Sequence, residues 1–193
     1  TVGFAMTSIR NGMAMAGSQP RADDTSVSGA AYAAMRMGRG FSDMYVGFSR
    51  QNFALSRAAQ GDFRSAFDMV QGDADGMQSF AGLRLGYAFR ILPGLEAGPV
   101  ASIDYVRNDL GGYSEFGAGN FGLTVLERSF TSVGSKAGVM ASLNTGIGRR
   151  GRLSAFGSVA YARELADTSD AVTAFFAGAA DVPFTIVSAL EPD

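Results

Sequence analysis

Apolar and polar side chains alternate along much of this chain with a repeat of two residues. Between 81 and 91 the odd positions are all apolar: Ala81, Leu83, Leu85, Tyr87, Phe89 and Ile91. The even positions between them hold only glycine, alanine or arginine. A repeat of two places successive side chains on opposite faces of a β-strand. Similar alternation over 95–105 and 153–161 predicts further strands whose two faces meet different surroundings.

The predicted strands are long. Strands in soluble sheets usually span about five or six residues, whereas roughly 9–11 residues allow a tilted strand to cross a bilayer. We therefore predict that the apolar faces meet lipid, with Tyr87, Tyr105 and Tyr161 in aromatic belts near the strand ends. The predicted strands cover 1–8, 27–37, 43–56, 79–91, 95–107, 119–128, 130–143, 152–165 and 171–187, the last broken by a bend.

The connections between these strands alternate in length. Those at 38–40 and 92–94 are tight, whereas those at 60–76 and 108–119 are long and polar. Outer-membrane barrels have short turns on one side of the membrane and longer loops on the other. The predicted fold is therefore all-β, an antiparallel transmembrane β-barrel that occupies residues 1–193 as a single domain.

Composition narrows the possible functions. The net charge of −2, from 16 basic and 18 acidic residues, argues against a nucleic-acid partner. The chain contains no cysteine and no histidine, which removes the usual nucleophile–base pairs and the commonest metal ligand. We expect no enzymatic activity, no cofactor and no metal site.

Three short motifs have simpler explanations than chemistry. The segment 146–151 matches G-x-G-x-x-G, but a strand pattern follows it where a phosphate-binding loop needs a helix, so we predict a hairpin turn. The segment 73–76 resembles the start of a calcium loop, yet the twelfth position is Arg84 rather than glutamate. Ser114 lacks a histidine partner, so we predict that 112–117 is a solvated loop.

Charged and small residues on the polar faces are candidates for lining an aqueous interior. Charges of mixed sign would each cost several kcal/mol in a dry core unless paired, and a water-filled lumen avoids that cost. The alternative is a soluble barrel with these charges on its outer surface. The candidate lumen-lining residues are Arg84, Gly86, Arg90, Glu96, Asp104, Lys136 and Glu164.

Several segments that follow one another along the chain carry a family resemblance. They are the Gly-Tyr strand at 80–89, the Pro-to-Tyr strand at 99–105, the Gly-Tyr-Ser-Glu loop at 112–118 and the strand ending in Tyr-Ala-Arg-Glu at 161–164. Together they resemble the β-barrel translocator domain of type V secretion autotransporters. The likeness covers 79–193, and 1–60 more loosely.

The resemblance implies a twelve-stranded barrel in the bacterial outer membrane that anchors and translocates an N-terminal passenger. Its implied partners are outer-membrane lipid, the passenger or its linker inside the pore, and the barrel-assembly machinery. A small outer-membrane porin or channel and a soluble ligand-binding β-barrel are the alternatives. Only about nine strands are predicted here, so we expect a domain incomplete at both ends, with free edges near 1–8 and 172–187.

Overall fold

A computed structural model describes residues 1–14, 21–59, 68–117, 119–147, 151–166 and 170–188. Strands dominate these residues, and the two helical segments are single 3₁₀ turns, η1 (Gly119–Phe121) and η2 (Ala177–Ala179). No helix in this part of the chain is long and apolar enough to span a membrane.

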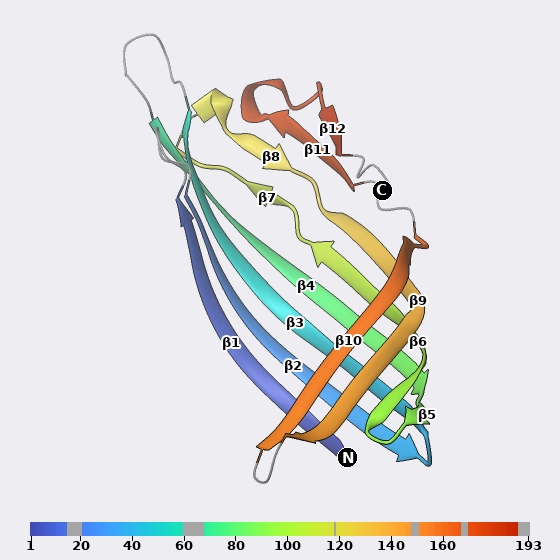
Figure 1. The fold of residues 1–193 in the computed structure, drawn as a ribbon. Helices are drawn as coiled ribbons and strands as arrows, with labels where there is room; N and C mark the ends of the chain where they lie inside the picture. The colour runs from blue at the N-terminus through green and yellow to red at the C-terminus, as the bar shows by residue number, and fades with distance from the viewer. Residues whose placement is uncertain (15–20, 60–67, 118, 148–150, 167–169, 189–193) are drawn as a thin grey trace.

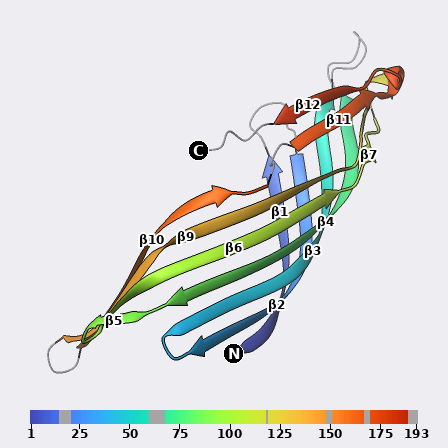
Figure 2. The same cartoon turned by 90° about the vertical axis from the view of Figure 1, so that its right-hand side faces the viewer.

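A large antiparallel sheet makes up most of the structure (Figure 1). Its long strands follow one another in the order β1, β2, β3, β4, β6, β9, β10, and the short β5 continues β4 and pairs with β6. Their bounds are β1 (Val2–Ala14), β2 (Arg21–Met37), β3 (Gly40–Ala59), β4 (Asp68–Tyr87), β5 (Phe89–Leu92), β6 (Leu95–Leu110), β9 (Arg128–Ile147) and β10 (Gly151–Glu164). Figure 2 shows how strongly this sheet curls. The predicted all-β, antiparallel class is confirmed.

A second, smaller sheet lies beyond one end of the large one (Figure 1). Its strands, in sheet order, are β12 (Phe184–Ser188), β11 (Asp170–Phe176), β8 (Leu123–Val125) and β7 (Tyr113–Ser114). In sequence β7 follows β6 and β8 precedes β9. The small sheet therefore extends the large one past the end of its long strands.

The two ends of the large sheet differ in their connections. At the turn end, Gly38 joins β2 to β3 with a φ of 61°, and Gly94 joins β5 to β6 with a φ of 83°. Only glycine adopts this left-handed backbone at little cost. The predicted hairpin turn at 148–150 lies outside the described residues, but Ile147 and Gly151 on either side pair directly. The opposite, long-loop end carries β7, β8, β11 and β12 (Figure 1).

Register separates the large sheet into an apolar and a polar face. In an antiparallel pair, residues directly opposite one another point to the same side. Leu83 lies between Met44 on β3 and Ile103 on β6, and all three side chains are exposed. The same face carries Val159 and Tyr161 at about three-quarters exposure, 76% and 75%. Apolar residues therefore cover the outside, which contradicts the soluble-barrel alternative, where they would fill the interior.

Two details of the sequence prediction need correction. Twelve strands rather than about nine occur in the described residues, because β5, β7 and β12 are short pieces that alternation cannot separate. The edge strands of the large sheet are β1 and β10, so the predicted edge near 1–8 is confirmed. Near 172–187 the edge strand is β12 of the small sheet, and the second edge of the large sheet is β10. Residues 170–188 instead form β11 and β12 of the small sheet. No pairing between described residues joins β1 to β10, and the sheet is not a closed barrel.

Candidate functional site

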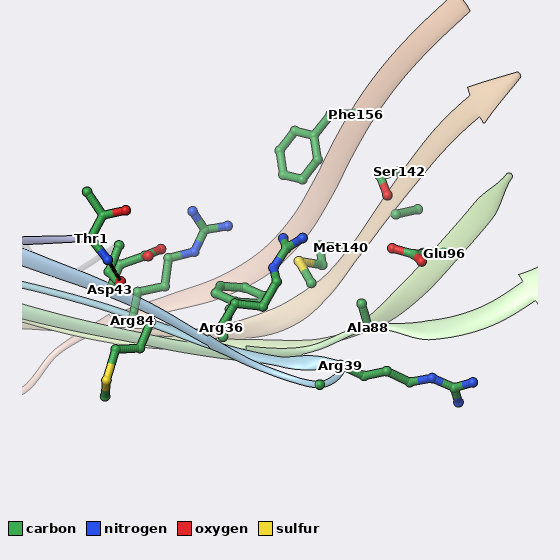
Figure 3. A pocket seen from close by; sticks show the side chains of 15 residues that line it. Thr1, Arg36, Arg39, Asp43, Arg84, Ala88, Glu96, Met140, Ser142 and Phe156 are labelled. Atoms are coloured by element: carbon green, nitrogen blue, oxygen red, sulfur yellow. Dashed lines mark hydrogen bonds between the residues drawn. The ribbon is translucent and has the colours of Figure 1, made fainter.

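The polar face of the large sheet is its concave face. A cavity of about 630 Å³ opens on it near the turn end. Thr1, next to β1, and Phe156 on β10 both line this cavity, together with residues from strands between them. Figure 3 shows Thr1 and Phe156 on opposite sides of the same hollow. Since the two edge strands border one cavity, the sheet curls around the polar side chains.

Charges of both signs surround this cavity. Arg36, Asp43, Arg84 and Glu96 come from β2, β3, β4 and β6 respectively (Figure 3). The guanidinium carbon of Arg84 lies 5.6 Å from the centre of the Phe41 ring, a cation–π distance. Mixed charges on a concave wall suit a water-filled space better than a dry one.

The register places all seven predicted lumen residues on this same face. Arg84 lies opposite Ser102, which lies opposite Lys136, and Arg90 lies opposite Glu96. The remaining three occupy equivalent positions: Gly86 opposite Val100, and Asp104 and Glu164 on the two sides of Gly134. Only Arg84 and Glu96 belong to the cavity near the turn end, and the others lie elsewhere along the face.

Cross-strand hydrogen bonds satisfy many polar groups of the concave face. Tyr45 Oη donates to Asp104 Oδ1 at 2.7 Å, and Ser132 Oγ donates to Glu164 Oε2 at 2.8 Å. The Tyr45 bond crosses β4 from β3 to β6, whereas two further pairs link directly neighbouring strands, Ser28 with Ser49 and Gln78 with Asn108. These bonds hold the polar side chains against the wall, where they present a hydrophilic surface.

Aromatic rings on the concave face lie over glycines of the neighbouring strand. Four such pairs stand directly opposite in register: Tyr32 over Gly3, Phe80 over Gly47, Tyr45 over Gly82 and Phe41 over Gly86. A Cβ atom at any of these glycines would collide with the facing ring. Each glycine lets a ring lie along the wall instead of projecting into the interior. Gly86 thus makes room for the Phe41 ring and is also a small residue of the concave face.

Adding a side chain at one of these ring-covered glycines is expected to destabilise the protein. Gly82→Val would force Tyr45 off its position and cost about 1–3 kcal/mol, the usual range for overpacking. Gly134→Val is the matched control, because a Cβ there meets no atom within 4 Å. Urea unfolding of the full-length protein in lipid vesicles measures both free energies. Equal losses for the two variants would contradict a specific ring-on-glycine contact.

A partly buried ion pair ties β3 to the loop after β7 at the long-loop end. Arg57 donates through Nε and Nη2 to the two carboxylate oxygens of Glu115, at 2.8 and 2.5 Å. The backbone N–H of Leu123 also donates to Glu115 Oε2, at 2.8 Å. The Glu115 side chain is only 7% exposed. The predicted solvated loop at 112–117 is therefore wrong for Glu115, which is a structural anchor.

The surroundings of this ion pair are closely packed. The Tyr113 ring covers Gly72 of β4, and burial together with the charge of Glu115 raises the pKa of the Tyr113 phenol. Val70 is 1% exposed, and Gln71 and Phe116 exchange backbone hydrogen bonds. The long-loop end thus has a small core of its own, which sequence alternation could not indicate.

The geometry of the described residues supports no catalytic or metal-binding role for the motifs at 73–76 and 112–117. Asp73 and Asp75 belong to the extended strand β4 and not to a calcium-type loop. Within the described residues, no group of three or more acidic side chains is placed to hold a metal ion. Ser114 lies within hydrogen-bond distance of Thr124, at 3.0 Å, on the exposed face of the small sheet.

An apolar convex face and a polar concave face on one curled antiparallel sheet are characteristic of transmembrane β-barrel proteins. Comparison with protein families identifies the group: residues 1–193 match the Autotransporter beta-domain family, and the chain belongs to that family. No curated protein matches the sequence. The protein is accordingly a translocator domain that resides in the outer membrane and exports a passenger domain, and not a porin or a soluble ligand-binding barrel.

Proposed function

We propose that the concave face lines the passage for the linker of the passenger, and that residues 1–193 work as one translocator unit without making or breaking bonds. One observation supports this most directly: polar residues from every long strand share the concave face, while four of its large rings lie over glycines. The residues proposed to line the passage are Arg84, Gly86, Arg90, Glu96, Asp104, Lys136 and Glu164.

A chain in transit brings backbone N–H and C=O groups that need partners. Water and wall hydroxyls can supply them, whereas a dry apolar wall would leave them unsatisfied at a cost of several kcal/mol each. Small concave residues such as Ala30 and Gly134 leave space beside the wall. The proposed passage therefore accepts many sequences, because its wall provides partners for backbone groups, which every sequence has.

The proposal includes the barrel-assembly machinery as a partner. Within the described residues, the outer side of β1 pairs with no strand, and backbone groups left in this way are costly in lipid. A partner that shelters this edge during insertion removes the cost. Depletion of the machinery is expected to leave the protein outside the membrane and sensitive to protease.

Cysteine labelling tests the passage, since the chain contains no native cysteine. Asp104→Cys and Ile103→Cys are neighbours on opposite faces of β6. In the full-length protein in vesicles, a charged maleimide is expected to label the Asp104→Cys variant at least about tenfold faster, because only that thiol meets water.

A stalled passenger provides the second measurement. A folded domain fused to the passenger arrests export, and the arrested linker is expected to protect the Asp104→Cys variant from the charged maleimide. The lipid-facing Ile103→Cys variant is the matched control and should not change with arrest. Unchanged labelling at Asp104→Cys during arrest would show that the passenger does not cross along the concave face.

A further inference from the structure

Outward-facing arginines recur at one place on the large sheet. On the four strands that run from the turn end toward the long-loop end, the apolar outward side chains give way to an arginine. These residues are Arg10 on β1, Arg50 on β3, Arg107 on β6 and Arg163 on β10, and all four are exposed. Their register places them on the apolar, convex face: Arg50 opposite Met77, for example, and Arg163 opposite Ser135.

The four arginines follow the stagger of the strands. Residues that stand opposite one another on successive strands form a row across the sheet. Arg50 lies in the same row as Ser8, Arg107 in the same row as Phe48, and Arg163 in the same row as Ile103. Ser8, Phe48 and Ile103 each lie nearer the turn end than the arginine of their own strand. The offset from one arginine to the next therefore always has the same direction. Strands in a barrel are tilted, so residues at one height are offset from row to row in this way. The arginines therefore form a belt at one level around the convex face.

Aromatic side chains place this belt at the boundary of the hydrocarbon. Two residues nearer the turn end, the outward positions are Phe48 on β3, Tyr105 on β6 and Tyr161 on β10. Aromatic belts mark the edge of the lipid-exposed band of membrane barrels. The arginines lie one outward position beyond that edge, at the level of lipid headgroups.

The opposite boundary carries no comparable charge. Among the described strand residues at the turn end, the outward side chains are all uncharged: Met35, Met37, Ser42, Tyr87, Leu95, Thr145, Ile147 and Leu153. Among the described strand residues, positive charge on the convex face is thus confined to the long-loop side of the membrane.

Most guanidinium groups of the belt have no acceptor among the described residues. Within the described part of the chain, the side chains of Arg10, Arg50 and Arg163 form no hydrogen bond or ion pair. Arg107 is paired with Asp109, Nη2 to Oδ1 at 2.8 Å, but both side chains remain 47% exposed. A guanidinium fork binds the oxygens of a phosphate in a bidentate manner.

We propose that this arginine belt binds the phosphate groups of lipids in the leaflet on the long-loop side. Charge complementarity supports the proposal, as does the direct continuity of the belt with the lipid-facing band. The inference depends on the family assignment, which places the protein in a membrane, and not on the passage proposed for the concave face. Bound phosphates would fix the depth of the barrel in the membrane.

Lipid binding by the full-length protein in detergent micelles tests the belt. The probe is lipid A, a diphosphorylated glucosamine lipid, and native mass spectrometry measures its retention. The variant Arg50→Gln/Arg107→Gln/Arg163→Gln is compared with Arg36→Gln/Arg84→Gln/Arg90→Gln, which removes the same charge from the concave face. An arginine near a charged membrane surface changes affinity about fivefold, so we expect about a hundredfold loss in the first variant and less than about twofold in the second.

Further arms of the experiment separate the possible outcomes. Lysine at the same three positions keeps the charge but loses the fork, and is expected to weaken binding by only a fewfold. Should the triple glutamine variant not fold, the three single variants are expected to lose about fivefold each. Unchanged binding in the belt variants, an equal loss in the concave-face variant, equal retention of dephosphorylated lipid A, or displacement by inorganic phosphate alone would each overturn the proposal.

Discussion

Arginine in place of Leu83 is expected to destabilise the membrane-inserted protein by about 2–4 kcal/mol. Leu83 lies in the lipid-facing row between Met44 and Ile103, well inside the outward apolar run of β4. Its replacement would leave a guanidinium group in hydrocarbon without an acceptor. Urea unfolding of the full-length protein in lipid vesicles measures the change in free energy.

Depth and face provide the controls for this substitution. Ile91→Arg, close to the turn end, is expected to cost only about 0–1 kcal/mol because it reaches the interface. Gly134→Arg places the same side chain on the concave face between Asp104 and Glu164, with no atom within 4 Å of the new Cβ. A loss at Gly134→Arg as large as that at Leu83→Arg would mean that the two faces do not meet different solvents.

Removing the Arg57 guanidinium is expected to loosen the long-loop end. Arg57→Met leaves the Glu115 carboxylate buried with only the Leu123 N–H as a partner. Breaking a fully buried ion pair costs roughly 3–5 kcal/mol. We expect about 2 kcal/mol here, because the Arg57 side chain is 34% exposed and water can partly replace it. Hydrogen exchange of the backbone over 111–127 measures the local stability directly.

Two further variants separate the ion pair from a general effect of charge. Arg50→Met removes an exposed arginine that makes no ion pair with the described residues, and exchange over 111–127 should not change. Adding Glu115→Gln to Arg57→Met removes the uncompensated charge, and about half of the lost protection should return. If Arg57→Met and Arg50→Met have the same effect, the Arg57–Glu115 contact does not hold the loop in place.

Alternation predicted the membrane-spanning parts of the strands closely. The predicted strands at 95–107 and 152–165 correspond to β6 (Leu95–Leu110) and β10 (Gly151–Glu164). Lipid on one side and water on the other impose opposite requirements on successive residues. A membrane-spanning strand is therefore visible in the sequence as alternation of apolar and polar residues. The same contrast placed the predicted lumen residues on one face before any geometry was available.

The prediction failed where both faces of a strand meet water. The segment 60–76 was interpreted as a long loop, but β4 begins at Asp68 and includes Asp73 and Asp75. Beyond the membrane no face needs to be apolar, and the period of two disappears while the backbone pairing continues. Polar strand extensions of this kind have no signal in hydrophobicity.

Pairwise contacts between distant residues were also beyond the reach of the sequence. Glycine at 86 suggested a small lumen residue, but only the register shows that Phe41 lies over it. Arg57 and Glu115 are 58 positions apart, and no periodicity relates them. Such contacts depend on which residues the stagger of neighbouring strands brings together, and local patterns do not contain that stagger.

The strand order of the large sheet also bears on how the protein folds. Each long strand pairs only with the long strands before and after it in sequence, from β1 through to β10. Loop closure is therefore short-range at nearly every step, which keeps the entropic barrier low for an all-β chain. The sheet can grow one hairpin at a time, so that each new hairpin covers the edge left by the last. The longest of these closures joins β6 to β9 across β7, η1 and β8, and it is the step expected to limit the folding rate.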